Sequence, residues 1–365
     1  MVLTSRGSAV RGRTRTAEPL LVSTTATGYT PAQMRSYLGL TGTGAGQTIA
    51  IVSAYDAPNV AADLAVFNKA FGLPAPPSFR KVNQTGGTKL PSVNATWALE
   101  TALDVQWAHA MAPGASILLV EASNSAMGNL LAGVTYAASQ PGVTVISGSF
   151  GTPEFSGQSA QDYRCKLTTA VCIFASGDSG GQATYPATMP AALAVGGTNL
   201  SLGTDGAVLS ETAWSGSGGG ISLYSTKPSF QVAVTSAARR ASPDVAYAAG
   251  EPAGFPVYST TPYNKQTGWF QMSGTSAGAP QWAGILAVGN ELRRAAGKGP
   301  LTAVGASGAT PLHTALYSRP TSLSDIVVGT NGTCGVVCSA LPGYDTVTGL
   351  GSPKRGLDLV LRDAP

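Results

Sequence analysis

The residues with the clearest chemical potential lie late in this chain of 365 residues, in the stretch QMSGTSAGAPQWAGI (271–285). Ser276 stands there between a glycine-flanked turn and a predicted helix, an arrangement that exposes a nucleophilic hydroxyl in hydrolases. A serine hydroxyl is a poor nucleophile until a positioned base removes its proton. The chain has two histidines, His109 and His313. Neither has a sequence context typical of a catalytic base, so a packed or surface position is the favoured interpretation for each.

Two acidic residues offer an alternative base. The stretch NATWALETALDVQWAHA reads as a helix capped by Asn94 or Thr96, and it carries Glu100 and Asp104 four residues apart. This spacing puts both carboxyl groups on one face of the helix, one turn from each other. Their neighbours are apolar, which indicates that the acidic stripe enters a site. Paired carboxyl groups in a poorly solvated place share a proton, and one of them can act as a general base.

A third acid, Asp178, follows an apolar run in FASGDSGG. A protonated aspartic acid at this place could donate a hydrogen bond to a developing oxyanion. A simple Asx turn is the competing interpretation, and it is favoured for Asp178 taken alone.

The elements that position these residues follow from the pattern of apolar residues. Short apolar runs and helical patterns alternate, which predicts a parallel sheet covered by helices on both faces. Function in such sheets gathers at the carboxyl ends of the strands, where Ser149 and Asp178 lie. Residues 198–275 read as short strands and glycine-rich loops, and we find no linker that would divide the core. The predicted strands are 48–55, 116–123, 143–151, 171–180 and 191–197, and the predicted helices are 60–71, 95–111, 126–139 and 276–296.

The composition indicates a globular protein that works outside the cell. The chain is 43% hydrophobic and 11% charged, with a formal net charge of +4. Few charges suit an acidic medium, where protonated carboxyl groups cannot sustain ion pairs. The basic stretch RGRTRT (11–16) is interpreted as a solvated tail, and a nucleic-acid-binding patch is the less favoured alternative. No apolar run reaches the roughly 18 residues of a membrane span, and the N-terminus lacks the apolar core of a signal peptide.

The four cysteines form two close pairs, Cys165/Cys172 and Cys334/Cys338. Even pairing in a chain with few charges predicts two disulfides that close short loops, and an oxidising compartment. A four-thiolate zinc site is the less favoured alternative, because zinc sites usually show tighter C-x-x-C spacing.

The three acidic and serine motifs together resemble those of the sedolisins, the serine-carboxyl peptidases. The resemblance runs from YTPAQMRSYLGL (29–40) to GYDTVTGLGSPKRGLDL (343–359). It implies Ser276 as nucleophile, Glu100 as general base, Asp104 as the residue that tunes Glu100, and Asp178 as the oxyanion donor. It also implies an α/β, subtilisin-like fold with a mostly parallel seven-stranded sheet, in one domain over residues 29–365. Residues 1–28 would then be a flexible segment that could be the remnant of a prosegment.

The same resemblance implies a substrate site and partners. SGSFG (147–151) matches the strand of the family that lines the substrate, with Phe150 where tryptophan is usual. Backbone groups around Ser149 and Gly151 would pair with an extended peptide. The expected partners are protein or peptide substrates, with no nucleic acid and no membrane, and the expected form is a secreted monomer.

A structural calcium ion is also implied, in a C-terminal loop. By analogy its ligands are the carboxylates of Asp325 and Asp345 with the carbonyl groups of Ile326, Leu341 and Gly343. The family often has glycine where Leu341 stands, so the carbonyl ligand survives only if the backbone there does not need a positive φ. The Cys334/Cys338 pair sits inside this loop.

Other functions stay open at this stage. A subtilisin-type protease would use Asp56, His109 and Ser276, but the sequence contexts of such a triad are absent. An inactive, peptidase-like binding protein and a lipase or esterase are further alternatives. Some sedolisins extend the acid network with a glutamate on the first strand, where this chain has Ser53.

Overall fold

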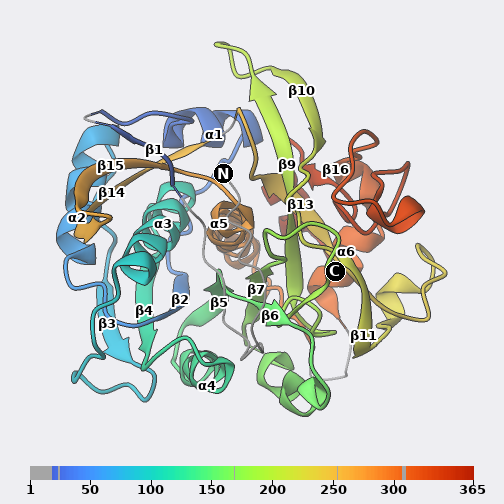
Figure 1. Cartoon of the computed structure of the whole chain (residues 1–365), viewed down its shortest axis with the longest axis horizontal. Coiled ribbons are helices and arrows are strands. Elements are labelled where there is room, and N and C mark those ends of the chain that lie inside the picture. The colour runs from blue at the N-terminus through green and yellow to red at the C-terminus, as the bar shows by residue number, and fades with distance from the viewer. Residues whose placement is uncertain (1–18, 24, 168, 253, 306–309) are drawn as a thin grey trace.

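The computed structural model describes residues 19–23, 25–167, 169–252, 254–305 and 310–365. Its centre is an eight-stranded sheet in which every pairing is parallel except that of β10, which runs antiparallel to β9 (Figure 1). The predicted mostly parallel α/β sheet is therefore confirmed. In spatial order its strands are β3 (Phe79–Asn83), β4 (Ser116–Ala122), β2 (Thr48–Ala54), β5 (Val143–Gly148), β7 (Val171–Ala175) and β9 (Leu193–Leu202), with β13 (Val245–Ala248) and β10 (Val208–Ala213) both pairing with β9.

Helices cover both faces of this sheet, as the apolar runs predicted. Strand β2 illustrates the reason, because its successive side chains alternate between two separate cores. Ile49 and Ile51 pack in the core with α2 (Val60–Phe71), α3 (Ala95–Met111) and α5 (Thr275–Ala295). Ala50 and Val52 pack in the core with α4 (Met127–Ala138) on the other face.

The predicted helices agree with these four elements to within a residue at each end. Helix α3 begins after Asn94, whose side-chain oxygen accepts a hydrogen bond from Trp97 N. It is buried all round, from Trp97 to Met111. A helix with no solvent face places its carboxyl groups inside the protein.

A second sheet lies beside α3 and has the order β1–β15–β14 (Figure 1). Strand β1 (Pro19–Ser23) pairs antiparallel with β15 (Gln266–Met272), which also pairs with β14 (Phe255–Tyr263). Residues 19–23, part of the segment 1–28 that was predicted to be flexible, thus form a strand. Pairing with a strand about 250 positions away leaves no local sequence signal. The basic stretch 11–16 lies outside the described residues.

Shorter elements complete the chain. Helix α1 begins with a capping box formed by Thr30 and Gln33. At the far end of α5, Arg293 donates hydrogen bonds to the carbonyl groups of Leu361 and Ala364 near the chain's end. The remaining elements are α1 (Pro31–Leu38), α6 (Pro311–Tyr317), α7 (Leu357–Asp363), β6 (Thr152–Pro153), β8 (Thr184–Tyr185), β11 (Gly220–Thr226), β12 (Arg239–Ser242), β16 (Leu323–Ser324), β17 (Ser352–Pro353) and the 3₁₀ turns Gln158–Cys165, Ser229–Gln231, Pro320–Ser322 and Gly335–Cys338.

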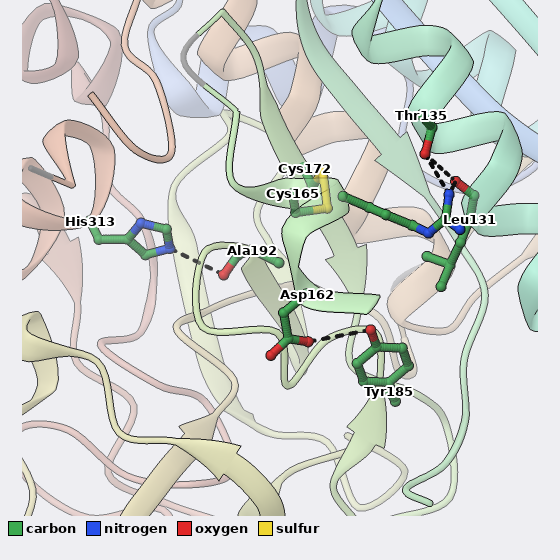
Figure 2. Close-up of a disulfide and its surroundings, with 9 residues drawn as sticks. Leu131, Thr135, Asp162, Cys165, Cys172, Tyr185, Ala192 and His313 are labelled. Carbon is green, nitrogen blue, oxygen red and sulfur yellow. Dashed lines mark hydrogen bonds between the residues drawn. A yellow bond between two sulfur atoms is a disulfide. The ribbon is translucent and has the colours of Figure 1, made fainter. Parts of the chain in front are cut away.

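Both predicted disulfides are present, Cys165–Cys172 and Cys334–Cys338. The first joins the 3₁₀ turn 158–165 to strand β7 (Figure 2). The zinc alternative is overturned, because the four sulfur atoms are consumed in two disulfides. Among the described helices, none is both long enough and apolar enough to cross a membrane.

Candidate active site

Ser276 lies in the first turn of α5, immediately after a sharp change of direction. Strand β15 ends at Met272, and Gly274 then adopts a φ of +106°, a conformation that favours glycine. The N–H of Gly274 donates to the carbonyl of Ala249 over 2.7 Å, which fixes the turn. Ser276 is 4% exposed and lines a cavity of about 60 Å³ at the carboxyl ends of the parallel strands.

A proline in α5 leaves the carbonyl of Ser276 without its usual helical partner. The residue four positions on is Pro280, which has no N–H to donate. The hydroxyl of Ser149 lies 3.3 Å from this carbonyl oxygen. The same hydroxyl donates to Asp104 Oδ1 over 2.6 Å. Ser149 therefore links the acidic face of α3 to the backbone of the serine.

Glu100 and Asp104 are both buried, each 1% exposed, on the helix that packs against α5. Burial raises the pKa of Asp104 to about 8, and the hydrogen bond from Ser149 opposes this shift. Burial therefore favours the protonated form of Asp104. A neutral Asp104 one turn from Glu100 lets the pair carry a single negative charge, which is the state that a carboxylate base requires.

We expect Ser149→Ala to lower kcat about tenfold with little change in KM, because Asp104 loses its donor while the backbone that faces the substrate is retained. Steady-state kinetics on a peptide substrate would measure this. Ser147→Ala is the matched control, since Ser147 is fully buried on the adjoining strand and its hydroxyl has no hydrogen-bond partner among the described residues. Equal kcat values for the two variants would contradict the assigned link.

Asp178 follows strand β7 and lines the same cavity as Ser276. Its Oδ1 accepts hydrogen bonds from the N–H and the hydroxyl of Thr275, both over 2.8 Å. The hydroxyl of Thr275 in turn accepts from Gly177 N over 3.1 Å. Burial raises the pKa of Asp178, and the two bonds from Thr275 act against the shift. One oxygen of the Asp178 carboxyl group is thus fixed on the first turn of α5. The Asx turn considered from the sequence does not account for this contact with a distant segment.

The three residues of the predicted substrate strand all line this cavity. Phe150 packs on Phe174 with 5.5 Å between ring centroids, and a side chain at Gly151 would meet Thr184 Oγ1 at 3.3 Å. Thr184 holds its position by donating to the carbonyl of Ser176 over 2.7 Å. The full lining is Ser149, Phe150, Gly151, Thr152, Pro153, Ala175, Gly177, Asp178, Ser179, Gln182, Thr184, Thr275 and Ser276.

Neither histidine lies at the cavity. His109 is buried, and its Nε2 lies 2.8 Å from the carbonyl of Pro74. His313 stacks on Phe230, and its Nε2 lies 3.1 Å from the carbonyl of Ala192 (Figure 2). Burial lowers the pKa of both histidines. Asp56, the third member of the subtilisin-type alternative, is paired with Lys81 over 2.7 Å. These contacts argue against a triad of Asp56, His109 and Ser276.

Ser53, which stands where some sedolisins carry a further acid, has a different partner. Its hydroxyl lies 2.7 Å from the hydroxyl of Thr101, the residue that follows Glu100. Asp104 is bonded to Ser149. The hydrogen bond to the Asp104 side chain thus comes from the hydroxyl of Ser149, and Ser53 contacts Thr101.

The two C-terminal acids lie close to the same backbone segment, residues 341–348. Asp345 is 5% exposed, and burial raises its pKa. Its oxygens accept bonds from the N–H groups of Leu341, Val347 and Thr348, while Asp325 accepts from Gly343 N over 2.8 Å. Leu341 is not among the described residues with positive φ. The backbone conformation at this position therefore allows a leucine, and its carbonyl group could still serve as a ligand.

The donor chemistry of this loop fits a hard cation. No cluster of three or more His, Cys, Asp or Glu side chains that could hold a metal occurs in the described part of the chain. The predicted set has two carboxylates, so backbone carbonyls and water would have to supply the remaining ligands. Asp345 is a buried carboxyl group with no Lys or Arg partner among the described ion pairs, an environment that a bound cation would stabilise.

Two contributors to the site were missed from the sequence. Thr275 anchors Asp178 and Gly177, and its position inside the SGTS motif could have suggested this role. Asn331 contacts the loop that carries Asp178 through the carbonyl that accepts from Gly181 N. No local pattern around Asn331 indicates such a contact, because it joins segments 150 residues apart.

The fold and the site define a subtilase. The family model named Subtilase family matches residues 92–315, which include Glu100, Asp104, Asp178 and Ser276. The chain therefore belongs to the subtilase family.

Within that family the chain is a sedolisin-type domain. It is 31% identical to kumamolisin from Bacillus sp. (strain MN-32) over 353 residues, which cover 85% of this chain and 59% of kumamolisin. It is 32% identical to sedolisin from Pseudomonas sp. (strain 101) over 179 residues, which cover 46% of this chain and 28% of that protein. The chain thus spans less than two thirds of the length of these curated relatives.

A solved structure extends the likeness to the whole fold. It is Pseudomonas sedolisin, a serine-carboxyl proteinase complexed with two molecules of pseudo-iodotyrostatin. It matches with a TM-score of 0.78 and 27% sequence identity, over 93% of this chain and 99% of that chain. The resemblance found in the motifs is thereby confirmed at the level of the family.

Proposed function

We propose that this protein hydrolyses peptide bonds of proteins in acid, through an acyl-enzyme formed on Ser276. The observation that carries the proposal is the convergence of Ser276, the Ser149–Asp104 link and Asp178 on one cavity that neither histidine reaches. The sedolisin relatives support a serine-carboxyl mechanism over a lipase or esterase. A binding protein without activity would have no need for a paired acid of raised pKa beside a serine.

In the proposed first step the Ser276 hydroxyl attacks the carbonyl carbon of the scissile peptide bond. Glu100 takes the hydroxyl proton as the C–O bond forms, and the carbonyl oxygen becomes an oxyanion. Protonated Asp178 donates a hydrogen bond to this oxyanion. Glu100 then gives the proton to the leaving amine as the C–N bond breaks. A water molecule repeats the sequence on the ester and frees the acid product.

Asp104 and Ser149 are positioning residues in this scheme. A neutral Asp104 leaves the negative charge of the pair on Glu100, and Ser149 holds Asp104 in place. The backbone of Ser149 and Gly151 would align an extended peptide across the cavity.

The test of the function is the pH dependence of peptide hydrolysis, for which we expect a bell-shaped profile with its maximum in acid. Glu100 must be ionised, so activity falls at low pH. Asp178 must keep its proton, so activity falls as the pH rises through its pKa, which burial places above the ordinary value near 4. Above about pH 8 ionisation of Asp104 adds a second charge to the pair.

The measurement is kcat/KM for an internally quenched peptide from pH 2 to pH 9, with circular dichroism at each pH to establish that the fold is retained. Mass spectrometry of a digest of denatured protein would first supply a cleavable sequence, and it would distinguish internal cleavage from release of tripeptides. Activity at pH 8 equal to that at pH 4 would overturn the mechanism. Absence of cleavage throughout would favour the inactive binding protein.

A calcium ion held by Asp325, Asp345 and the carbonyl groups of Ile326, Leu341 and Gly343 is part of the proposal. The ion would stabilise the loop and has no role in the chemistry.

We expect 1 mM Ca²⁺ to raise the Tm of metal-stripped protein by several degrees, since a ligand that binds the native state stabilises it by mass action. Differential scanning calorimetry at pH 5 measures this without reference to activity. Asp325→Asn should reduce the shift, because it removes one carboxylate charge from the site. An unchanged Tm in Ca²⁺ would remove the ion from the proposal.

The two disulfides support export to an oxidising compartment as the place of action. Sedolisin relatives and a cavity lined by a predicted peptide-binding strand support protein or peptide substrates. Work outside the cell in acid also agrees with the low content of charged residues.

A further inference from the structure

The loop that carries Asp178 is rich in glycine, which has no side chain to hold the backbone in place. Residues 177–182 read GDSGGQ, and three of the six are glycine. Thr275 fixes the loop on the side of α5. The opposite side must be held by other segments, because glycine adds conformational freedom to the backbone.

A second glycine-rich loop, residues 214–219, packs behind the first. Gly218 N donates to the carbonyl of Gly177 over 2.6 Å, and Gly180 N donates to the carbonyl of Gly216 over 3.0 Å. Gly219 N completes the contact with a bond of 3.2 Å to the carbonyl of Gln182. These backbone bonds join the two glycine-rich loops to each other. A third segment is therefore needed to hold both loops in place.

Asn331 and the Cys334–Cys338 disulfide form that element. The carbonyl of Asn331 accepts from Gly181 N over 2.7 Å, and its Nδ2 donates to the carbonyl of Ser217 over 2.8 Å. Its own N–H donates to the carbonyl of Cys338 over 3.0 Å, across the loop that the disulfide closes. Asn331 is 3% exposed. Asn331 therefore joins the disulfide loop to both glycine-rich loops, through its side chain to residues 214–219 and through its backbone to residues 177–182.

The 177–182 loop is in close contact with the 331–338 segment. A Cβ added at Gly181 would lie 2.3 Å from the sulfur of Cys338, and one added at Gly180 would lie 2.4 Å from the carbonyl oxygen of Asn331. The loop of Asp178 thus rests directly on the disulfide and on the backbone of Asn331. A shift of the 331–338 segment would move Asp178 relative to the oxyanion.

We propose that Asn331, braced by the Cys334–Cys338 disulfide, is a positioning residue that holds the Asp178 loop in its productive place. The inference rests on the proposed function, because it assigns Asp178 the role of donor to the oxyanion. It adds a residue outside the three motifs and gives the C-terminal disulfide a part in catalysis.

The deciding experiment compares Asn331→Ala and Asn331→Asp with the wild-type protein. Asn331→Ala removes the donor to Ser217, and we expect kcat to fall between about tenfold and a hundredfold with KM changed less than about threefold, because small displacements of a catalytic group mainly cost rate. Asn290→Ala is the matched control. Asn290 is 1% exposed near the far end of α5 and bonds one loop amide, Leu301 N, over 2.9 Å.

Asn331→Asp provides a conservative rescue that depends on pH. A protonated aspartic acid is nearly isosteric with asparagine and can donate to the Ser217 carbonyl, whereas its ionised form cannot. In the three facing segments, 177–182, 214–219 and 331–339, Asp178 is the titratable side chain and both cysteines are bridged. We expect near wild-type kcat in the most acidic range and an alkaline limb displaced to lower pH.

Hydrogen exchange followed by mass spectrometry gives a readout independent of activity. Asn331→Ala should speed exchange in residues 214–219, where the Ser217 carbonyl loses its donor, and in residues 177–182, which bond that loop through Gly180 N, while Asn290→Ala should change neither. Wild-type protein that cleaves nothing would overturn the proposed function, and the exchange data would still test the brace. Wild-type kcat in Asn331→Ala, an unmoved alkaline limb in Asn331→Asp, or unchanged exchange would each overturn the inference.

Discussion

Peptide hydrolysis is expected to disappear in the Ser276→Ala variant, with a fall in kcat of about 10⁴-fold or more. The acyl-enzyme route needs an oxygen nucleophile at this position, and alanine leaves water to attack the peptide directly. The variant should fold normally, because the side chain contributes a single hydroxyl at the cavity wall.

A serine-reactive fluorophosphonate offers a second measurement of the same prediction. Mass spectrometry should place its adduct on the peptide that contains Ser276 in the wild-type protein and find no adduct in the variant. A Tm within a few degrees of wild type would establish that the fold is retained. Turnover that survives in purified Ser276→Ala would show that another residue attacks the substrate.

The second large effect is expected for Glu100→Gln, which should lower kcat about 10²- to 10⁴-fold, the range of general-base contributions. Glutamine matches glutamate in shape but cannot take up a proton. The loss of kcat should persist at every pH. If the charge of Glu100 only adjusted the pKa of a neighbouring group, its removal would instead shift the pH profile of kcat to higher or lower pH.

The matched control is Glu121→Gln, which replaces the other fully buried glutamate. Glu121 lies on β4, its Oε1 accepts from Ala57 N over 2.9 Å, and burial raises its pKa to about 8. Burial favours its neutral form in acid, although Lys81 Nζ lies 3.9 Å from its Oε1 and opposes the shift, and the amide should leave kcat there nearly unchanged. Comparable losses in the two variants would indicate a general effect of buried glutamates and would remove Glu100 as the base.

Much of the fold could be predicted because its signals are local. Helix α3 has a polar cap at Asn94, followed by seventeen residues without glycine or proline. Strands β2, β4, β5 and β7 are short runs that are apolar on both faces, and this pattern is typical of a covered parallel sheet. The short separation within each cysteine pair likewise predicted both disulfides.

The parts that sequence reasoning missed depend on contacts between distant segments. Strand β1 forms on an edge provided by β15, which lies about 250 residues later. Residues 177–182 and 214–219 contain many glycines and carry no periodic pattern, so their mutual bonds and their bond to Asn331 emerge only in three dimensions. The motifs identify the candidate reactive side chains. The contacts among these loops, which position those side chains, could not be predicted from the motifs.

The proposed mechanism uses a carboxyl pair where many serine hydrolases use an imidazole, and this choice would fit an acidic medium. A histidine would be protonated there and could not accept the serine proton. A buried acid pair that holds one proton keeps a basic oxygen available at the same pH. The low content of charged residues and the buried carboxyl groups of raised pKa are consistent with such a working range.

Arg293 is buried near the end of α5, about 25 Å from Ser276 along the helix axis. Its guanidinium group donates to the carbonyl groups of Gly299, Leu361 and Ala364. Local opening of residues 361–364 would leave part of this buried group without acceptors and would loosen one end of α5. The local stability of residues 361–364 would thus affect the helix that presents Ser276.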